Sequence, residues 1–161
     1  MASADYFKTK ILGKTAHGSA TYEGIDAILI SVAIIMNLQS IVSREMNPLN
    51  PIVISVGMIE SGMGFNIISS ESIIEGTTRC FNSNIRKDLP IIIERMAKNT
   101  AWAFRARAEI EYNYGTSPLI NNKICSKRAE ELAKKLFGNE CICKIDRLTI
   151  SDDFRVYINN T

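Results

Sequence analysis

The segment from Gly24 to Arg44 constrains the fold most, because its apolar residues form two stripes instead of one. With about 100° of rotation per helical residue, one stripe contains Ile25, Ile28, Leu29, Val32, Ile35 and Met36, and the opposite stripe contains Ile30, Ile34, Leu38 and Ile41. A helix packed on one sheet would leave the second stripe in water, which monomeric soluble proteins seldom tolerate. The segment therefore predicts a helix with two packing partners, one of which is the sheet of its own domain.

The second stripe predicts a dimer interface made by Ile30, Ile34, Leu38 and Ile41. A two-fold symmetric homodimer is the most natural closed arrangement, with the same helix face meeting its copy. Two alternatives stay open. A later helix over residues 122–137 could cover the stripe within one chain, or residues of a larger enzyme could cover it.

The remaining patterns give an ordered series of strands and helices. Alternating or β-branched residues predict strands, and a 3.6-residue period with Asn and Ser caps predicts helices. The expected order is strand 6–12, helix 24–44, strand 52–60, strand 70–81, a helix after residues 82–84, and strand 106–114. Within the second helix, Pro90 indicates either a kink or a regular part that begins near Asp88. This βαββαβ order predicts an α+β, ferredoxin-like sandwich, with a four-stranded antiparallel sheet and two helices on one face.

A C-terminal extension follows this first unit, which we place at residues 4–117. Residues 118–161 contain an expected helix from about Asn122 to Phe137, closed by Gly138, and an expected short strand from Cys141 to Ile145. One helix and one strand bury too little surface to be stable alone, so we expect the extension to pack on the first unit or on another domain.

Composition excludes several classes of function. Nineteen Lys and Arg against 17 Asp and Glu give a net charge of +2, so no broad basic surface for nucleic acid is expected. The longest apolar run, residues 27–36, falls short of the roughly 20 residues that cross a bilayer. Without an export signal, and with four cysteines in no disulfide or zinc spacing, the chain is expected to be cytoplasmic. A single histidine, His17, predicts no metal site within this chain.

A family resemblance begins at residues 13–27, GKTAHGSATYEGIDA. This segment resembles the G-K-x-x-H-x-x-x-P-x-x-G-x-(N/D)-A motif in the lid, or dimerisation, domain of zinc-dependent aminoacylase and carboxypeptidase-type amidohydrolases. Residues 41–45, 62–68 and 75–81 are similar to later motifs of that domain, in the same order. Residues 117–122 and 151–154 are similar to points where the family's chain re-enters its catalytic domain. Thr21-Tyr22 and Ser69 depart from the family, which has Pro-His and Pro there.

The resemblance implies a lid inserted into a catalytic domain that holds two divalent metal ions, with zinc as the expected metal. It assigns His17 to stabilising the oxyanion at the partner subunit's active site, a role that an imidazole donor can fill. It assigns Asn66 and Arg79 to holding the substrate and its carboxylate, which a guanidinium grips in a bidentate fork.

The resulting hypothesis is a homodimerising, substrate-contacting part of a metal-dependent hydrolase. The enzyme would cleave N-acyl amino acids or small peptides next to a free carboxylate, and this chain would be inactive by itself. The alternative is a stand-alone protein-interaction module without catalysis. The sequence assigns no role to Asp152, to Asp153 or to the four cysteines.

Overall fold

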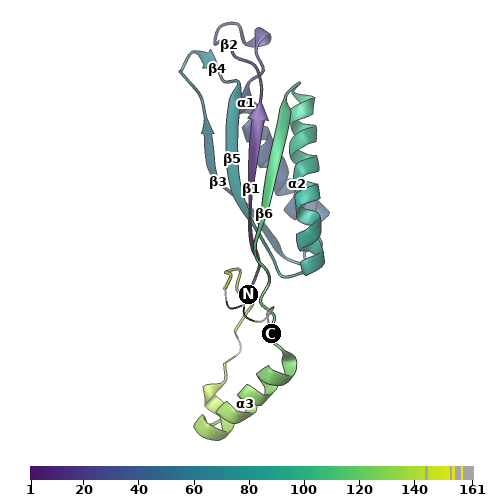
Figure 1. Cartoon of the computed structure of the whole chain (residues 1–161), viewed down its shortest axis with the longest axis vertical. Helices are drawn as coiled ribbons and strands as arrows, with labels where there is room; N and C mark the ends of the chain where they lie inside the picture. Colours follow the sequence, from purple (N-terminus) through teal and green to yellow (C-terminus); the bar gives the residue numbers. More distant parts are fainter. Residues whose placement is uncertain (144, 153, 155–156, 158–161) are drawn as a thin grey trace.

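The computed structural model describes residues 1–143, 145–152, 154 and 157 of the chain. Its main body contains four long strands and two long helices (Figure 1). In chain order these are β1 (Ala4–Leu12), α1 (Ala27–Ser40), β3 (Ile52–Ser61), β5 (Glu71–Cys80), α2 (Ser83–Ala103) and β6 (Arg107–Thr116). The predicted order of elements is therefore confirmed, and the predicted and observed ends differ by at most four residues.

The four long strands form one antiparallel sheet in the order β3-β5-β1-β6. This is the predicted ferredoxin-like topology, in which β1 lies in the middle although it comes first in the chain. Alternate residues of β1 show that one face is covered, since Phe7 and Ile11 are fully buried and Tyr6 is exposed. The open face carries half-exposed ion pairs, among them Lys8 with Glu75 at 3.1 Å.

Helix α1 begins at Ala27, where the side chain of Asp26 accepts a hydrogen bond from the backbone N–H of Ile28 at 2.9 Å. A π-helical turn, η2 (Ile41–Glu45), follows α1 directly. Together they cover most of the predicted helical segment, although its first turn lies outside the helix. A side chain–side chain hydrogen bond of 3.0 Å joins Asn37 of α1 to Thr100 of α2, so the two helices pack side by side on the sheet.

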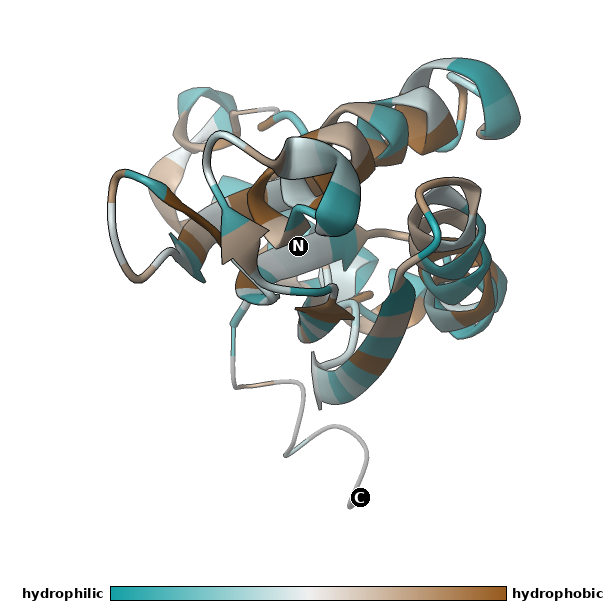
Figure 2. Cartoon of the chain, turned by 90° about the horizontal axis from the view of Figure 1, so that it is seen from above, coloured by the Kyte–Doolittle hydropathy of each residue, from teal (hydrophilic) through white to brown (hydrophobic). Residues whose placement is uncertain are grey.

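The prediction of which α1 stripe faces its own sheet is wrong. The four residues expected at a dimer interface are fully buried in the sheet core: Ile30, Ile34, Leu38 and Ile41. The exposed side of the helix instead carries Ile28, Leu29, Val32 and Met36. Hydrophobic residues run along most of α1 (Figure 2), and because both stripes are apolar, periodicity gave no basis for choosing between them.

The apolar character of α1 also has a consequence for membrane insertion. By length and composition, residues 27–45 form one helix that could cross a bilayer, a test that core helices of soluble proteins also pass. In this fold one stripe of α1 packs on the sheet, and this packing accounts for the apolar character of that stripe without a membrane.

Helix α2 begins at Ser83, with Asn82 as its N-cap, and continues through Pro90 to Ala103. The alternative in which the regular helix begins near Asp88 is therefore wrong. Leu89 and Ile93 of this helix are fully buried against the sheet. The described part of the second unit contains α3 (Lys123–Phe137), capped by Asn122 and ended by Gly138 at a φ of 85°.

The second unit lies at the end of the domain where the N-terminus is found, and α3 points away from the sheet (Figure 1). No residue of α3 is buried, so α3 does not cover α1. The expected strand at 141–145 is not formed in its described residues, because residues 139–141 make a short 3-10 helix, η3. The segment after it does pack on the first unit, since the backbone N–H of Ala2 donates to the carbonyls of Leu148 and Ile150 at 3.1 Å. Asp153 lies outside the described residues.

Candidate functional site

Two of the predicted site residues, His17 and Asn66, are brought together at one end of the domain. A small two-stranded sheet beyond the main sheet does this, formed by β2 (Ala16–His17) and β4 (Ile67–Ile68), with His17 opposite Ile67. Figure 1 shows these two strands side by side at the end opposite α3. We call this unit, residues 13–25 and 62–70, the tip.

A backbone contact fixes the spacing within the tip. The N–H of Gly18 donates to the carbonyl of Asn66 at 2.7 Å. A Cβ atom at Gly18 would lie 2.9 Å from that carbonyl oxygen, closer than real Cβ atoms come to backbone. Glycine is therefore required at residue 18 for the two segments of the chain to approach each other this closely.

Hydrogen bonding sets the tautomer of the His17 ring. The backbone N–H of Ser19 can only donate, and it donates to Nδ1 of His17 at 3.2 Å. The hydroxyl of Ser19 also lies 2.7 Å from Nδ1. Nδ1 is therefore the acceptor nitrogen in the neutral ring, and the proton sits on Nε2. His17 is exposed, so this Nε2–H group can donate to an oxygen of a bound molecule.

Asn66 is exposed as well, and its main chain is held in a turn. The N–H of Ile67 donates to the carbonyl of Gly64 at 3.2 Å, and the Gly18 contact holds the carbonyl of Asn66. A side-chain amide of this kind offers both donors and an acceptor to a ligand. The tip thus presents an imidazole N–H and a carboxamide from two chain segments about 50 residues apart in sequence.

The third predicted residue, Arg79, lies elsewhere. Strand β5 runs from Glu71 near the tip to Cys80 at the opposite end of the sheet, which we call the base. Arg79 lies eight residues beyond Glu71, or about 26 Å along the strand at roughly 3.3 Å per residue. Nη1 of Arg79 donates to the carbonyl of Thr149 at 3.4 Å, within the segment that packs on the base. One chain alone does not bring Arg79 to His17 and Asn66.

A buried ion pair ties the base of the domain together. Both carboxylate oxygens of Asp5 accept from Arg86, at 2.6 and 2.9 Å, and the N–H of Gly115 donates to Asp5 at 2.9 Å. The side chain of Asp5 is completely buried. The hydrogen bond to Asp5 raises the pKa of Arg86, whose guanidinium stays charged. No local sequence pattern marks this pair, because its partners are 81 residues apart.

An exposed apolar surface runs along α1 and reaches the free edge of β3. It consists of Ile28, Leu29, Val32 and Met36, which sequence analysis had grouped together but assigned to the sheet. A Cβ atom on Gly62, just after β3, would lie 3.8 Å from Cδ1 of Ile28, so the stripe begins beside the end of this outer strand. Ile59 of β3 is exposed too and is paired with the buried Ile74, so it lies on the helix side of the sheet. We call these five residues the α1–β3 surface.

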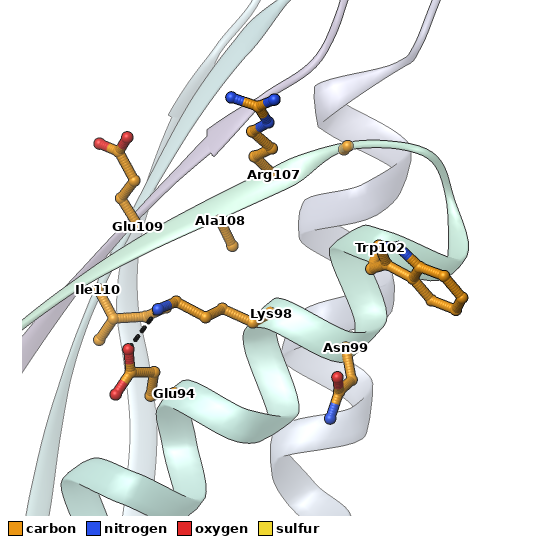
Figure 3. Close-up of a pocket in the computed structure, with 9 residues that line it drawn as sticks. Glu94, Lys98, Asn99, Trp102, Arg107, Ala108, Glu109 and Ile110 are labelled. Carbon is orange, nitrogen blue, oxygen red and sulfur yellow. Dashed lines mark hydrogen bonds and ion pairs between the residues drawn. The ribbon is translucent and has the colours of Figure 1, made fainter.

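A pocket lies between α2 and β6, at the opposite edge of the sheet (Figure 3). It measures about 560 Å³, and no predicted site residue lines it. Lys98 is paired there with Glu94 at 2.5 Å, and Figure 3 shows Trp102 turned outward from the strand. Its charges are mixed and partly paired, so we assign no chemistry to this pocket.

The described residues contain no group of three or more His, Cys, Asp or Glu side chains that could hold a metal ion. These residues do not fit a metal centre by themselves. His17 and Asn66 of the tip can supply hydrogen bonds to a ligand.

Comparison with known proteins places these features in context. The peptidase dimerisation domain family model matches residues 3–103. The N-acyl-L-amino acid amidohydrolase of Geobacillus stearothermophilus is 40% identical over 121 residues, which cover 75% of this chain and 33% of the relative.

Two solved structures share the fold. A dinuclear metal-binding peptidase of the M20 family from Bacillus subtilis has a TM-score of 0.80 and 26% identity, covering 99% of this chain and 38% of that one. A tripeptidase from Staphylococcus aureus has a TM-score of 0.68 and 25% identity, covering 84% of this chain and 35% of that one. The chain thus spans between a third and two fifths of the length of these three proteins.

Proposed function

Because this chain belongs to the peptidase dimerisation domain family of the M20 hydrolases, we propose that it joins two subunits of a metal-dependent hydrolase and contributes substrate contacts. The proposed substrates are N-acyl amino acids or small peptides with a free carboxylate next to the scissile bond. Zinc is the metal we propose, and the cytoplasm is the proposed compartment.

The observation that carries this proposal is the pairing of His17 with Asn66 at the tip. The Nε2–H group of His17 is placed to donate to a carbonyl oxygen as negative charge develops on it. The carboxamide of Asn66 is placed to bind the substrate carboxylate or an adjacent amide. Both groups are exposed, as contacts to a second subunit's active site require.

We assign Arg79 to the same substrate but to a different subunit. Arg79 lies at the base of the domain, about 26 Å along β5 from the tip, so one chain cannot supply all three groups to one small molecule. In a two-fold dimer, the tip of one subunit can approach the base of its partner. The proposed site therefore takes His17 and Asn66 from one subunit and Arg79 from the other.

The α1–β3 surface is the proposed contact between the subunits. It combines an apolar helix stripe with an outer strand that has an unpaired edge, and such edges are templates for pairing with a second copy. Burial of each large apolar side chain is worth on the order of 1.5–3 kcal/mol. Two copies that meet through this surface would bury both stripes and extend the sheet across the dimer.

The chemistry of bond cleavage belongs to another domain in this proposal. The described residues hold no metal-binding group, so we propose that a separate catalytic domain binds the ions. Bound metal ions would activate the attacking water. We expect the 161-residue chain alone to hydrolyse neither N-acetyl amino acids nor dipeptides, with or without added zinc, cobalt or manganese.

A mixing experiment tests the shared site. In the hydrolase assembled with its catalytic domain, His17→Ala and Arg79→Ala subunits are each prepared as homodimers of low kcat/KM. The two are then mixed, allowed to exchange and assayed at a substrate concentration well below KM. If the site is shared, each mixed dimer contains one site with both residues intact, so about a quarter of wild-type activity should return. If both residues serve the same subunit's site, mixing restores nothing.

A further inference from the structure

The tip carries one aromatic side chain that the fold does not use. Phe65 immediately precedes Asn66, and its relative exposure is 104%, the highest of any large apolar residue described. It lies in the turn that leads into β4, where the Gly18 and Gly64 hydrogen bonds hold the main chain. A rigid turn therefore presents Phe65 to solvent beside the candidate substrate ligand.

From this placement we infer that Phe65 is a specificity residue that contacts the side chain of the substrate's amino acid, an inference that rests on the proposed function. In an N-acyl amino acid, the amino acid side chain and the carboxylate are attached to the same carbon. Asn66 is proposed to bind the carboxylate. A protein residue next to Asn66 is therefore nearer to the substrate's amino acid side chain than to its acyl group. The scissile carbonyl, which is assigned to His17, belongs to the acyl group. The rest of the acyl group lies beyond this carbonyl, on the far side of the scissile bond from the amino acid side chain.

The chemistry of the tip agrees with this assignment. His17 and Asn66 recognise polar atoms, and they cannot distinguish a substrate with a large apolar side chain from one with none. An exposed phenyl ring gains binding energy only when it is covered by apolar surface. Phe65 thus favours substrates such as leucine or methionine derivatives over glycine derivatives.

Three substrates separate the possible roles of Phe65. N-acetylglycine has a small acyl group and no side chain, N-acetyl-L-leucine adds an apolar side chain, and N-benzoylglycine adds an apolar acyl group. The variants are Phe65→Ala and the milder Phe65→Leu, measured in the assembled hydrolase. Trp102→Ala is the matched control, because Trp102 is also a largely exposed aromatic but lines the pocket beside β6.

Phe65→Ala should lower kcat/KM for N-acetyl-L-leucine by about tenfold or more, the effect of losing one apolar contact. Phe65→Leu should have a smaller effect in the same direction. Values for N-acetylglycine and N-benzoylglycine should stay within about twofold, and Trp102→Ala should change none of the three.

Other outcomes overturn the inference. An equal loss on all three substrates, with a changed oligomeric mass, would make Phe65 a subunit contact. A loss confined to N-benzoylglycine would place Phe65 against the acyl group, and no loss on any substrate would leave it without a role in specificity. A wild-type hydrolase that cleaves none of the three, and no dipeptide either, would instead contradict the proposed function.

Discussion

The backbone N–H of Gly18 donates to the carbonyl of Asn66 at 2.7 Å, and this bond joins the two chain segments that carry the candidate substrate contacts. His17 directly precedes the donor, so the bond holds the main chain of His17 close to the main chain of Asn66. The bond lies outside the main sheet, because β2 and β4 form a separate sheet. His17, Gly18 and Asn66 are exposed, so they can be altered without removing core contacts.

Gly18→Ala should disturb the tip alone. The added Cβ would meet the Asn66 carbonyl at 2.9 Å and push the two segments apart. We expect kcat/KM of the assembled hydrolase to fall by about tenfold or more, as small displacements of catalytic groups do. Gly64→Ala is the matched control, since its Cβ would make only an ordinary contact of 3.4 Å with Ile67. Equal effects of the two variants would show that the Gly18 contact has no special role.

His17→Ala should lower kcat of the assembled hydrolase by roughly 10²-fold or more, because it removes a donor to the developing oxyanion. Steady-state kinetics with N-acetyl amino acids measures this, and circular dichroism checks that the fold is kept. His17 is exposed, so the variant should fold normally. An unchanged kcat would remove His17 from the site.

Arg79→Ala should chiefly raise KM, since its proposed partner is a carboxylate present in both the ground state and the transition state. Arg107, an exposed arginine on β6, provides the matched control through Arg107→Ala. A similar rise in KM for both variants would indicate a general effect of positive charge.

Asp5→Ala should destabilise the chain by about 3–5 kcal/mol, because it leaves the Arg86 guanidinium without its buried partner. Urea unfolding of the 161-residue chain measures the loss. Glu75→Ala breaks the half-exposed pair with Lys8 and should cost much less stability, because water screens this pair. If the two variants lose the same stability, the base of the domain does not depend on the Asp5 ion pair.

The sequence predicted the order and class of the elements well, because each long strand and helix has a clear period. It did not predict the orientation of α1, whose two apolar stripes, represented by Ile34 and Val32, are equally hydrophobic by pattern. Only packing on the sheet decides that Ile34 is buried and Val32 exposed. The C-terminal strand expected at 141–145 is not formed in its described residues, where Cys141 belongs to the short 3-10 helix η3.

The candidate site was predicted only in part, for a similar reason. The motifs identified His17, Asn66 and Arg79, but sequence spacing does not show which ends of the sheet they occupy. The separation of Arg79 from the tip follows from the length and direction of β5. Phe65 lay within a motif, but its complete exposure becomes visible only once the turn is built.

Dimerisation through the α1–β3 surface is the central claim, and the molar mass of the 161-residue chain tests it most directly. Size exclusion with light scattering at micromolar concentration should give about 36 kDa, twice the 17.9 kDa of one chain. Val32→Asp, on the exposed stripe, should give a folded monomer, whereas Ile34→Asp should unfold the domain because Ile34 is buried. A wild-type chain that is monomeric and soluble under these conditions, or a Val32→Asp variant that stays dimeric, would contradict the account.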